Sequence, residues 1–420
     1  MSKSAPEFVR KQYALRDDLV RSFFSAEAAA VALLCHDMAR RFARGGRLIA
    51  FGAGAAATDA QHLSVEFVHP VIVGKRALPA LALVNDVSAL GAALTDASGF
   101  FARRLELMAR EQDVAVGIVH GAEDPGREAV AAALKQASAL GMLTLSLGAS
   151  DTAAAADHVF EVPSRDRFIV QEVQETLYHL VWELVHVFFE HKGLLDDRDE
   201  RSTHHTGRSS FLYPFLAEQE KGLDTVLTQL ERSVVDKASD VCAMRASSIE
   251  PEALTETARL IAERVSAGGK VLAFGNGGSA TDAQDLVGDL VGPPRGMKPV
   301  PAVSLTNDEA VMTALGNDVG FENVFVRQVI AHAHQSDVAI AISTSGGSRN
   351  VVAAVEEAKR RGLLTVGLAG YGGGRLAEVC DRTHSITGDY IPRIQEAQAS
   401  QYHVLRRLID AAVVAREGDA

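Results

Sequence analysis

The feature that most constrains the fold is an internal repeat. The stretch GAGAAATDAQHLSVEF begins at Gly52 and GNGGSATDAQDLVGDL begins at Gly275, so the second follows the first by 275 − 52 = 223 residues. Matching segments flank both stretches: residues 45–51 match 268–274, residues 113–119 match 337–343, and residues 141–147 match 362–368. A period of this length indicates duplicated domains and not a solenoid of short units.

Each copy alternates short apolar β-rich runs with Ala-rich helical stretches. Continuous apolar runs are typical of strands buried on both faces of a parallel sheet. The expected fold class is therefore α/β, with two tandem three-layer α/β/α domains that each hold a mainly parallel sheet of about five strands. The predicted domains are 1–195 and 211–420, and the polar stretch 196–210, with His204 and His205, is the predicted linker.

Charge and composition exclude several classes of protein. The 420-residue chain is 47% hydrophobic and has a formal net charge of −12, which argues against a nucleic-acid surface because phosphate backbones bind basic faces. Three scattered cysteines are too few for a disulfide framework or a cysteine metal site. The first residues form no apolar signal core, and no stretch is expected to span a membrane. A cytoplasmic protein is expected.

The second copy contains two loops suited to binding phosphate. In GNGGSATDAQ a glycine-rich turn follows a strand and opens a helix, so backbone N–H groups and the helix dipole can face an anion. In ISTSGGSRN, residues 342–350, hydroxyl groups precede another helix, which they can also cap. Two such loops at strand ends in one domain favour phosphate binding over capping. The predicted phosphate ligands are Asn276, Gly277, Gly278, Ser279, Ser343, Thr344, Ser345 and Ser348.

A dinucleotide-binding fold is the alternative interpretation of the two glycine-rich turns. That fingerprint requires an acidic residue about 20 residues after its first glycine. Here the acids that end the next strands, Asp86 and Asp308, follow the first glycines by 86 − 52 = 34 and 308 − 275 = 33 residues. The spacing disfavours a dinucleotide site.

The first copy lacks the residues that would bind phosphate. Ala56 stands at the position of Ser279, and VHGAED (119–124) replaces the serine-rich stretch. Glu123 and Asp124 would repel a phosphate, so the first copy is not expected to bind one in its own loops.

The first copy instead carries candidate acid–base residues. His62 and Glu66 are four residues apart on the helix after the turn, so they share one face. Gln171 and His179 lie on a long predicted amphipathic helix, 167–190. Taken singly, the structural interpretations are favoured: an exposed helix pair for the first two residues, and a satisfied buried histidine for His179.

In combination, four segments resemble the phosphoheptose isomerases of the sugar isomerase (SIS) domain group: GNGGSATDAQ, ISTSGGSRN, TALGNDVGFENVF and RIQEAQASQYH. The resemblance covers essentially the whole second copy and, more faintly, all of the first. It implies two SIS domains and an enzyme that interconverts sedoheptulose 7-phosphate and D-glycero-D-manno-heptose 7-phosphate. Such an aldose–ketose isomerisation moves a proton between C1 and C2 through an enediol, so it needs one base and one acid.

The resemblance also implies roles for particular residues. Glu66 would be the base and His179 the acid, and the zinc that some members bind would be held by these two with His62 and Gln171. The family's aspartate in the GND segment falls on Asp318 in the second copy and on Asp96 in the first. The second copy departs from the family at Asp285 and Asp289, which replace His and Glu, and keeps Gln395 and His403.

The length of the helix after the glycine-rich turn indicates that one working site combines residues from both copies. From Ser279 to Asp289 is ten residues (289 − 279), about 15 Å along a helix, which exceeds the reach of an extended sugar phosphate from phosphorus to carbonyl. A base on this helix should therefore serve a phosphate loop of another domain, and the family's active sites lie at subunit interfaces of a tetramer. We expect composite sites, with phosphate bound by the second copy and acid–base groups from the first, in a homodimer that forms a pseudo-tetramer of SIS domains.

Two other functions are compatible with the motifs. One is a non-catalytic sugar-phosphate sensor or protein-interaction SIS protein of the replication-initiator-associating type, which needs phosphate loops but no acid–base set. The presence of His62, Glu66, Gln171 and His179 favours the enzyme. The other keeps the reaction but acts on a different ketose phosphate or on an aminosugar phosphate.

Overall fold

The computed structural model describes residues 5–72, 75–86, 88, 99–124, 126–148, 156–190, 194–195 and 222–418. The predicted linker, with His204 and His205, and Asp96 lie outside these residues. The chain forms two compact units, Leu19–Ser239 and a second one that joins the first 18 residues to Asp240–Ala420. We call them the N-terminal unit and the C-terminal unit.

The N-terminal unit contains a five-stranded sheet in the order β2-β1-β3-β4-β5, and every pairing is parallel. The residues of β1, β3 and β4 are all buried, as expected for strands covered on both faces. The strands are β1 (Leu48–Phe51), β2 (Ala80–Ala82), β3 (Val114–Ile118), β4 (Leu143–Leu147) and β5 (His158–Phe160).

Helices follow the strands in this unit, as in other doubly wound folds. The longest of those that lie wholly within it, α6, is buried along nearly its entire length. The helices are α2 (Ala55–Val68), α4 (Phe100–Met108), α5 (Arg127–Ala139) and α6 (Arg167–Glu190), and parts of α1 (Ala5–Ala43) and α7 (Leu223–Ser248) also belong to it.

The C-terminal unit repeats this topology, with the sheet order β7-β6-β8-β9-β10 and parallel pairing throughout. Its strands are β6 (Val271–Phe274), β7 (Ala302–Ser304), β8 (Val338–Ser343), β9 (Leu364–Ala369) and β10 (Arg382–Ser385). Its helices are α8 (Pro251–Ser266), α9 (Gly278–Val291), α10 (Glu309–Asp318), α11 (Val324–His332), α12 (Arg349–Arg360), α13 (Leu376–Val379) and α14 (Ile391–Gly418), with short 3-10 turns η6 (Phe321–Asn323) and η7 (Tyr371–Gly373). The predicted class, two α/β/α domains with parallel five-stranded sheets, is confirmed.

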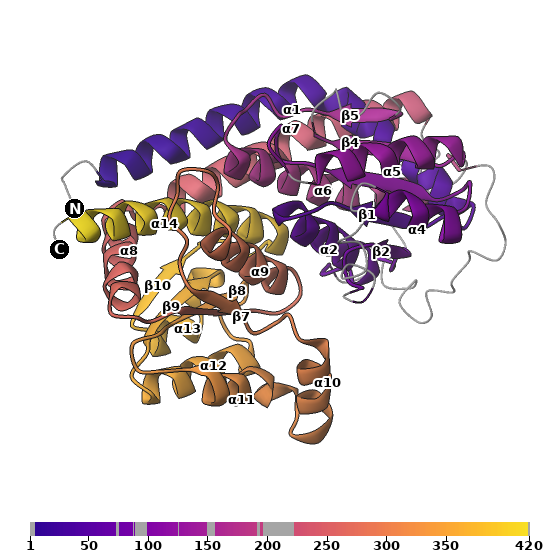
Figure 1. Ribbon diagram of the computed structural model, residues 1–420. Helices are drawn as coiled ribbons and strands as arrows, with labels where there is room; N and C mark the ends of the chain where they lie inside the picture. Colours follow the sequence, from indigo (N-terminus) through magenta and orange to yellow (C-terminus); the bar gives the residue numbers. More distant parts are fainter. Residues whose placement is uncertain are drawn as a thin grey trace. The chain divides into compact units, whose positions relative to one another are not determined.

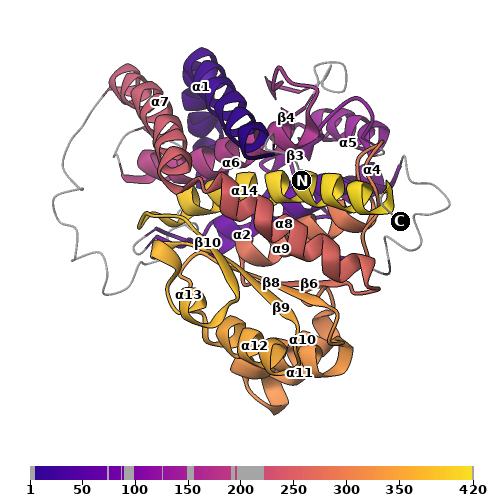
Figure 2. The ribbon, with the colours of Figure 1, turned by 90° about the vertical axis from the view of Figure 1, so that its left-hand side faces the viewer.

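Helices cover both faces of the C-terminal sheet (Figures 1 and 2). Alternate strand residues point to opposite faces: Val271 and Ala273 join a core with α8, α9 and α14, whereas Leu272 and Phe274 join a core with α11, α12 and α13. The first of these cores also includes Val9 and Tyr13 of α1. Val9 and Tyr13 therefore pack with the C-terminal unit, although the predicted domain 1–195 assigned them to the first copy.

The sequence predicted that no stretch would span a membrane, but helix α1 meets the length and composition of a candidate span. Its most apolar 18-residue window has a mean hydropathy of 1.3, so by length and composition it is a candidate span, the only one among the described helices. Half of that window is buried inside the structure, as it is in core helices of globular domains.

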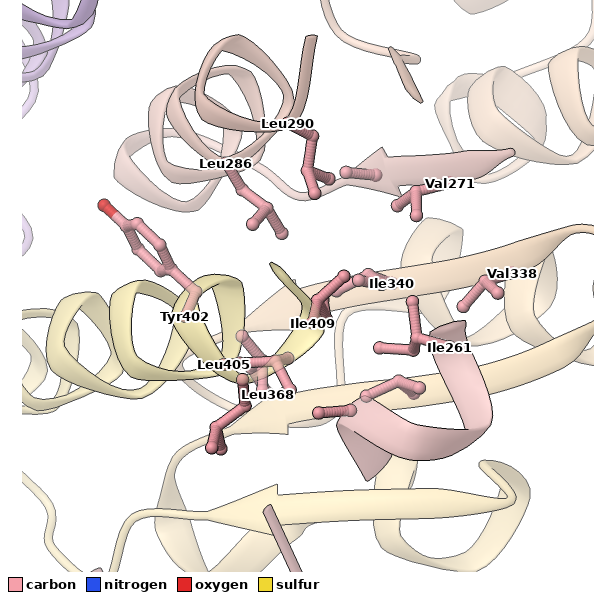
Figure 3. Packing of buried hydrophobic residues seen from close by; sticks show 14 of the residues in the cluster. Ile261, Val271, Leu286, Leu290, Val338, Ile340, Leu368, Tyr402, Leu405 and Ile409 are labelled. Atoms are coloured by element: carbon pink, nitrogen blue, oxygen red, sulfur yellow. The ribbon is translucent and has the colours of Figure 1, made fainter. Parts of the chain in front are cut away.

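Replacing Ile340 by alanine is expected to destabilise the C-terminal unit by about 2–5 kcal/mol. Ile340 lies on the central strand β8, is fully buried, and packs in the core that contains Leu286 and Ile409 (Figure 3). Denaturant unfolding checks the prediction, and Val303→Ala on the edge strand β7, where the side chain is 40% exposed, is the matched control. A similar loss in both variants would contradict the assignment of this core.

Candidate active site

Two loops meet where the C-terminal sheet reverses its winding direction. Strands β6 and β8 are neighbours, and the chain leaves β6 into α9 and β8 into α12, helices that belong to opposite faces. Ligands of open α/β sheets bind beyond the carboxyl ends of the strands at such a switch point. The predicted phosphate loops, 275–279 and 343–348, are the segments located there.

The second of these loops, residues 343–348, is called the serine loop, and the first, residues 275–279, the glycine-rich loop. The serine loop holds a cluster of hydroxyl groups that do not cap α12. Ser343 Oγ lies 3.4 Å from Ser345 Oγ and 3.2 Å from Ser348 Oγ. Ser348 is the N-cap residue of α12 by position, yet its side chain makes no capping hydrogen bond. These hydroxyls can therefore donate to an anion at the start of the helix.

The backbone of both loops adopts conformations that require glycine. Gly277 precedes α9 with φ +57°, and Gly346 has φ +62°. A Cβ on Gly346 would lie only 2.3 Å from the carbonyl oxygen of Gly373, so this loop packs directly on the turn after β9. Of the two glycines predicted as phosphate ligands, Gly277 is exposed directly before α9, whereas Gly278 is a buried residue of its first turn.

Among the described residues, no hydrogen bond joins Asp318 to these loops. It is the exposed last residue of α10, and its carboxylate accepts a hydrogen bond of 2.8 Å from the neighbouring Asn317. Asp308, the acid compared above with the dinucleotide fingerprint, caps the N-terminus of α10. Its carboxylate accepts a hydrogen bond of 2.8 Å from Val311 N–H. Asp318 as a substrate ligand stays a prediction.

In the N-terminal unit, the corresponding loop is closed by its own carboxylate. Asp124 accepts hydrogen bonds from the backbone N–H groups of His120 (3.2 Å) and Gly126 (3.1 Å), directly before α5. The negative charge that a phosphate would bring is thus already supplied by the chain. His120 Nε2 in turn lies 2.6 Å from the buried carboxylate of Asp59.

Three of the predicted acid–base residues form one buried cluster in the N-terminal unit. His62 Nε2 lies 3.7 Å from Glu66 Oε1 and 3.4 Å from His179 Nε2. His62 and Glu66 come from α2 and His179 from α6, and each is at most 2% exposed. The exposed-pair interpretation of His62 and Glu66 is therefore wrong, because the helix face they share points into the unit.

Burial sets the proton affinities in this cluster. It lowers the pKa of His62 well below the usual value, and the neighbouring His179 lowers it further. Burial also raises the pKa of Glu66, an effect that His179 opposes and the nearby Glu183 reinforces. A carboxylate with a raised pKa is a stronger base, and a neutral imidazole is free to bind a metal.

The cluster has the donor set that zinc binds. One ring nitrogen from each histidine and one oxygen of Glu66 lie within 4.8 Å of one another. Among the described residues, Glu66 Oε2 and Gln171 Oε1 are buried without a hydrogen-bond partner, so both retain open acceptor atoms. Gln171 itself makes one hydrogen bond, from its Nε2 to Asp59 at 3.5 Å, and none to the other three residues.

The sequence interpretation did not single out Asp59, His120 and Tyr178. Asp59 receives Tyr178 O–H at 3.4 Å in addition to Gln171 and His120, so it connects α2 to α6 and to the loop after β3. Asp59 lies in the TDAQ segment that both copies share, and this identity was the available signal.

The C-terminal unit has a different cluster at the matching positions. Asp285 accepts hydrogen bonds from Tyr402 O–H (3.0 Å) and from His403 Nε2 (3.3 Å), and Asp289 lies 3.9 Å from the same nitrogen. Two carboxylates and an imidazole are thus buried together, and Asp285 already receives two donors. This arrangement differs from the N-terminal one by the loss of one imidazole and the shorter acids.

Comparison with known proteins identifies the family. The family model for the SIS domain matches residues 13–149 and 226–370. The chain is 42% identical over 185 residues to a phosphoheptose isomerase of Rhodospirillum rubrum, which covers 43% of this chain and 96% of that protein. It is 48% identical over 142 residues, 34% of this chain and 76% of the relative, to a phosphoheptose isomerase of Nitratiruptor.

A solved structure shows the same fold over nearly the whole chain. The C-terminal domain of glucosamine-fructose-6-phosphate aminotransferase from Francisella tularensis matches 96% of this chain and 95% of its own, with a TM-score of 0.58 and 9% identity. With two SIS segments and relatives matched over most of their length, the chain belongs to the SIS domain family, in its phosphoheptose isomerase branch, and is an isomerase.

Proposed function

We propose that the protein interconverts a ketose and an aldose phosphate, most specifically sedoheptulose 7-phosphate and D-glycero-D-manno-heptose 7-phosphate. The observation that carries the proposal is the buried cluster of Glu66, His62 and His179. A sensor would need no base with a raised pKa beside an imidazole. The names of the relatives support the choice of a seven-carbon sugar phosphate.

Glu66 acts as the base that moves the proton between C1 and C2, and His179 acts as the acid that protonates the carbonyl oxygen. The raised pKa of Glu66 brings its proton affinity closer to that of a carbon acid beside a carbonyl, and burial excludes water that would compete for the proton. His62 is held neutral, so it can accept or donate one hydrogen bond without adding charge.

The same residues fit a zinc ion, held by His62, Glu66 and His179 with Gln171 as the fourth candidate. When bound, zinc would supply polarisation of the substrate carbonyl. The two oxygens of Glu66 differ, since Oε1 faces His62 whereas Oε2 has no partner in the described residues, so one oxygen can bind metal and the other can take the proton.

We further propose that each working site combines the two units. The C-terminal unit contributes the hydroxyl cluster of Ser343, Ser345 and Ser348, and the N-terminal unit contributes the acid–base cluster. Each unit is incomplete alone: the N-terminal loop is closed by Asp124, and the C-terminal cluster has Asp in place of Glu66 and His62. A homodimer would then be a pseudo-tetramer of SIS domains with two working sites.

Incubation of the purified protein with sedoheptulose 7-phosphate, with detection of the aldose product, tests the proposed reaction. We expect conversion in both directions. No conversion despite measurable binding of the sugar phosphate would contradict the enzyme and support a sensor.

Metal analysis of the purified chain is expected to find one Zn²⁺ per chain, lost in His62→Ala because three ligands no longer converge. The matched control is Asp285→Ala, at the corresponding position of the C-terminal unit, which should keep the metal. Retention of zinc in His62→Ala, or its loss only in Asp285→Ala, would contradict the assignment of the ligands.

A further inference from the structure

Two asparagine side chains connect the phosphate loops of the C-terminal unit. Asn276, in the loop after β6, donates from Nδ2 to Asn350 Oδ1 at 2.9 Å, and Asn350, in the first turn of α12, donates from Nδ2 to Asn276 Oδ1 at 2.8 Å. Asn350 is 4% exposed, and its Oδ1 also accepts Val351 N–H at 3.0 Å. The pair is therefore a reciprocal amide contact, held in place from the Asn350 side.

This contact fixes one phosphate loop relative to the other. The two loops leave neighbouring strands toward helices on opposite faces of the sheet, and no secondary structure joins them beyond the ends of β6 and β8. A phosphate held by both loops needs their donors at a set separation, because each donor must reach about 3 Å from an oxygen. Since each amide nitrogen has two N–H groups, Asn276 keeps one for the ligand.

The N-terminal unit shows what happens where the phosphate function is absent. The positions of Asn276 and Asn350 are occupied there by Ala53 and by Ala129, the first buried residue of α5. Neither alanine can form an amide pair, and the two loops instead touch directly at Gly126, the residue before α5, where a Cβ would lie 2.2 Å from the Cβ of Ala53. The same sheet order forms without the asparagines, so folding does not require them.

We propose that Asn350 is a positioning residue that, through Asn276, holds the serine loop and the glycine-rich loop as one phosphate cradle. Asn350 acts without touching the ligand. The inference rests on the proposed binding of sugar phosphate in the C-terminal unit, and it does not depend on turnover.

Binding and kinetics of three variants test the proposal: Asn276→Ala, Asn350→Ala, and the double variant. Affinity for inorganic phosphate and for sedoheptulose 7-phosphate is measured by calorimetry on the full chain. We expect Asn350→Ala to weaken both about tenfold, the effect of one hydrogen bond to a charged ligand. KM should rise by the same factor while kcat stays unchanged, and the double variant should be no worse than Asn276→Ala.

The melting temperature of the double variant separates positioning from folding. This variant carries alanine at both positions, as the N-terminal unit does, so it should melt near the wild-type temperature and still bind phosphate weakly. Wild-type affinity in Asn350→Ala, or losses in the two single variants that add fully in the double variant, would overturn the inference. A wild-type chain that binds sedoheptulose 7-phosphate without converting it would count against the proposed reaction and leave the binding test of Asn350 intact.

Discussion

Replacing Glu66 by glutamine is expected to lower kcat about 10²–10⁴-fold, the range that a general base contributes. Glutamine has nearly the same shape and can still fill the buried position beside His62, but it cannot accept the proton that moves between C1 and C2. Rates of ketose-to-aldose conversion, together with the affinity for the substrate, measure the effect. The affinity should change little, because in the proposed site the phosphate is bound by the serine loop and not by Glu66.

Asp289→Asn is the matched control, since Asp289 occupies the position of Glu66 in the C-terminal unit. It lies in a buried group with His403 and Asp285, so the substitution makes a similar change of charge in a similar environment. We expect kcat close to the wild-type value. Full activity in Glu66→Gln, or an equal loss in Asp289→Asn, would show that the base has been assigned to the wrong residue.

Replacing Ser348 by alanine is expected to raise KM for the sugar phosphate about 10–100-fold, since a hydrogen bond to a charged group contributes about 1.5–3 kcal/mol. Ser348 precedes α12 but does not cap it, and its Oγ lies 3.2 Å from that of Ser343, so the hydroxyl is available to an anion. Ser343→Ala should behave in the same way. Steady-state kinetics and direct binding measure both variants.

Asp124→Asn, in the corresponding loop of the N-terminal unit, is the control for the serine variants. The amide oxygen of asparagine can keep one of the two backbone hydrogen bonds that close this loop. We expect KM to stay at the wild-type value. A rise in KM for Asp124→Asn as large as that for Ser348→Ala would mean that phosphate is bound in the N-terminal unit.

The fold could be predicted from the sequence because two independent signals agree. Continuous apolar runs indicate strands with both faces buried, and the repeat requires both copies to use them in the same order, as the two sheets do. The packing of Val9 and Tyr13 with the C-terminal core could not be predicted in this way. An amphipathic helix shows which face is buried, but its own residues do not specify the core that covers that face.

The candidate site could be predicted where its residues are close in the chain. His62 and Glu66 are one helical turn apart, so their shared face follows from spacing alone. His179 is 117 residues from His62, and its place in the cluster was expected only from the resemblance to a family. The Asn276–Asn350 and Asp59–His120 contacts span 74 and 61 residues, and no local pattern connects such side chains.

The most direct test of the composite site is a crystal structure of the full chain with the Glu66→Gln substitution, soaked with sedoheptulose 7-phosphate. We expect the phosphate at the hydroxyls of Ser343 and Ser348, and the C1–C2 end of the same sugar within about 3 Å of the side chain at position 66. A sugar whose C1–C2 end lies against Asp289 and His403, with position 66 opening onto a different cavity, would contradict it.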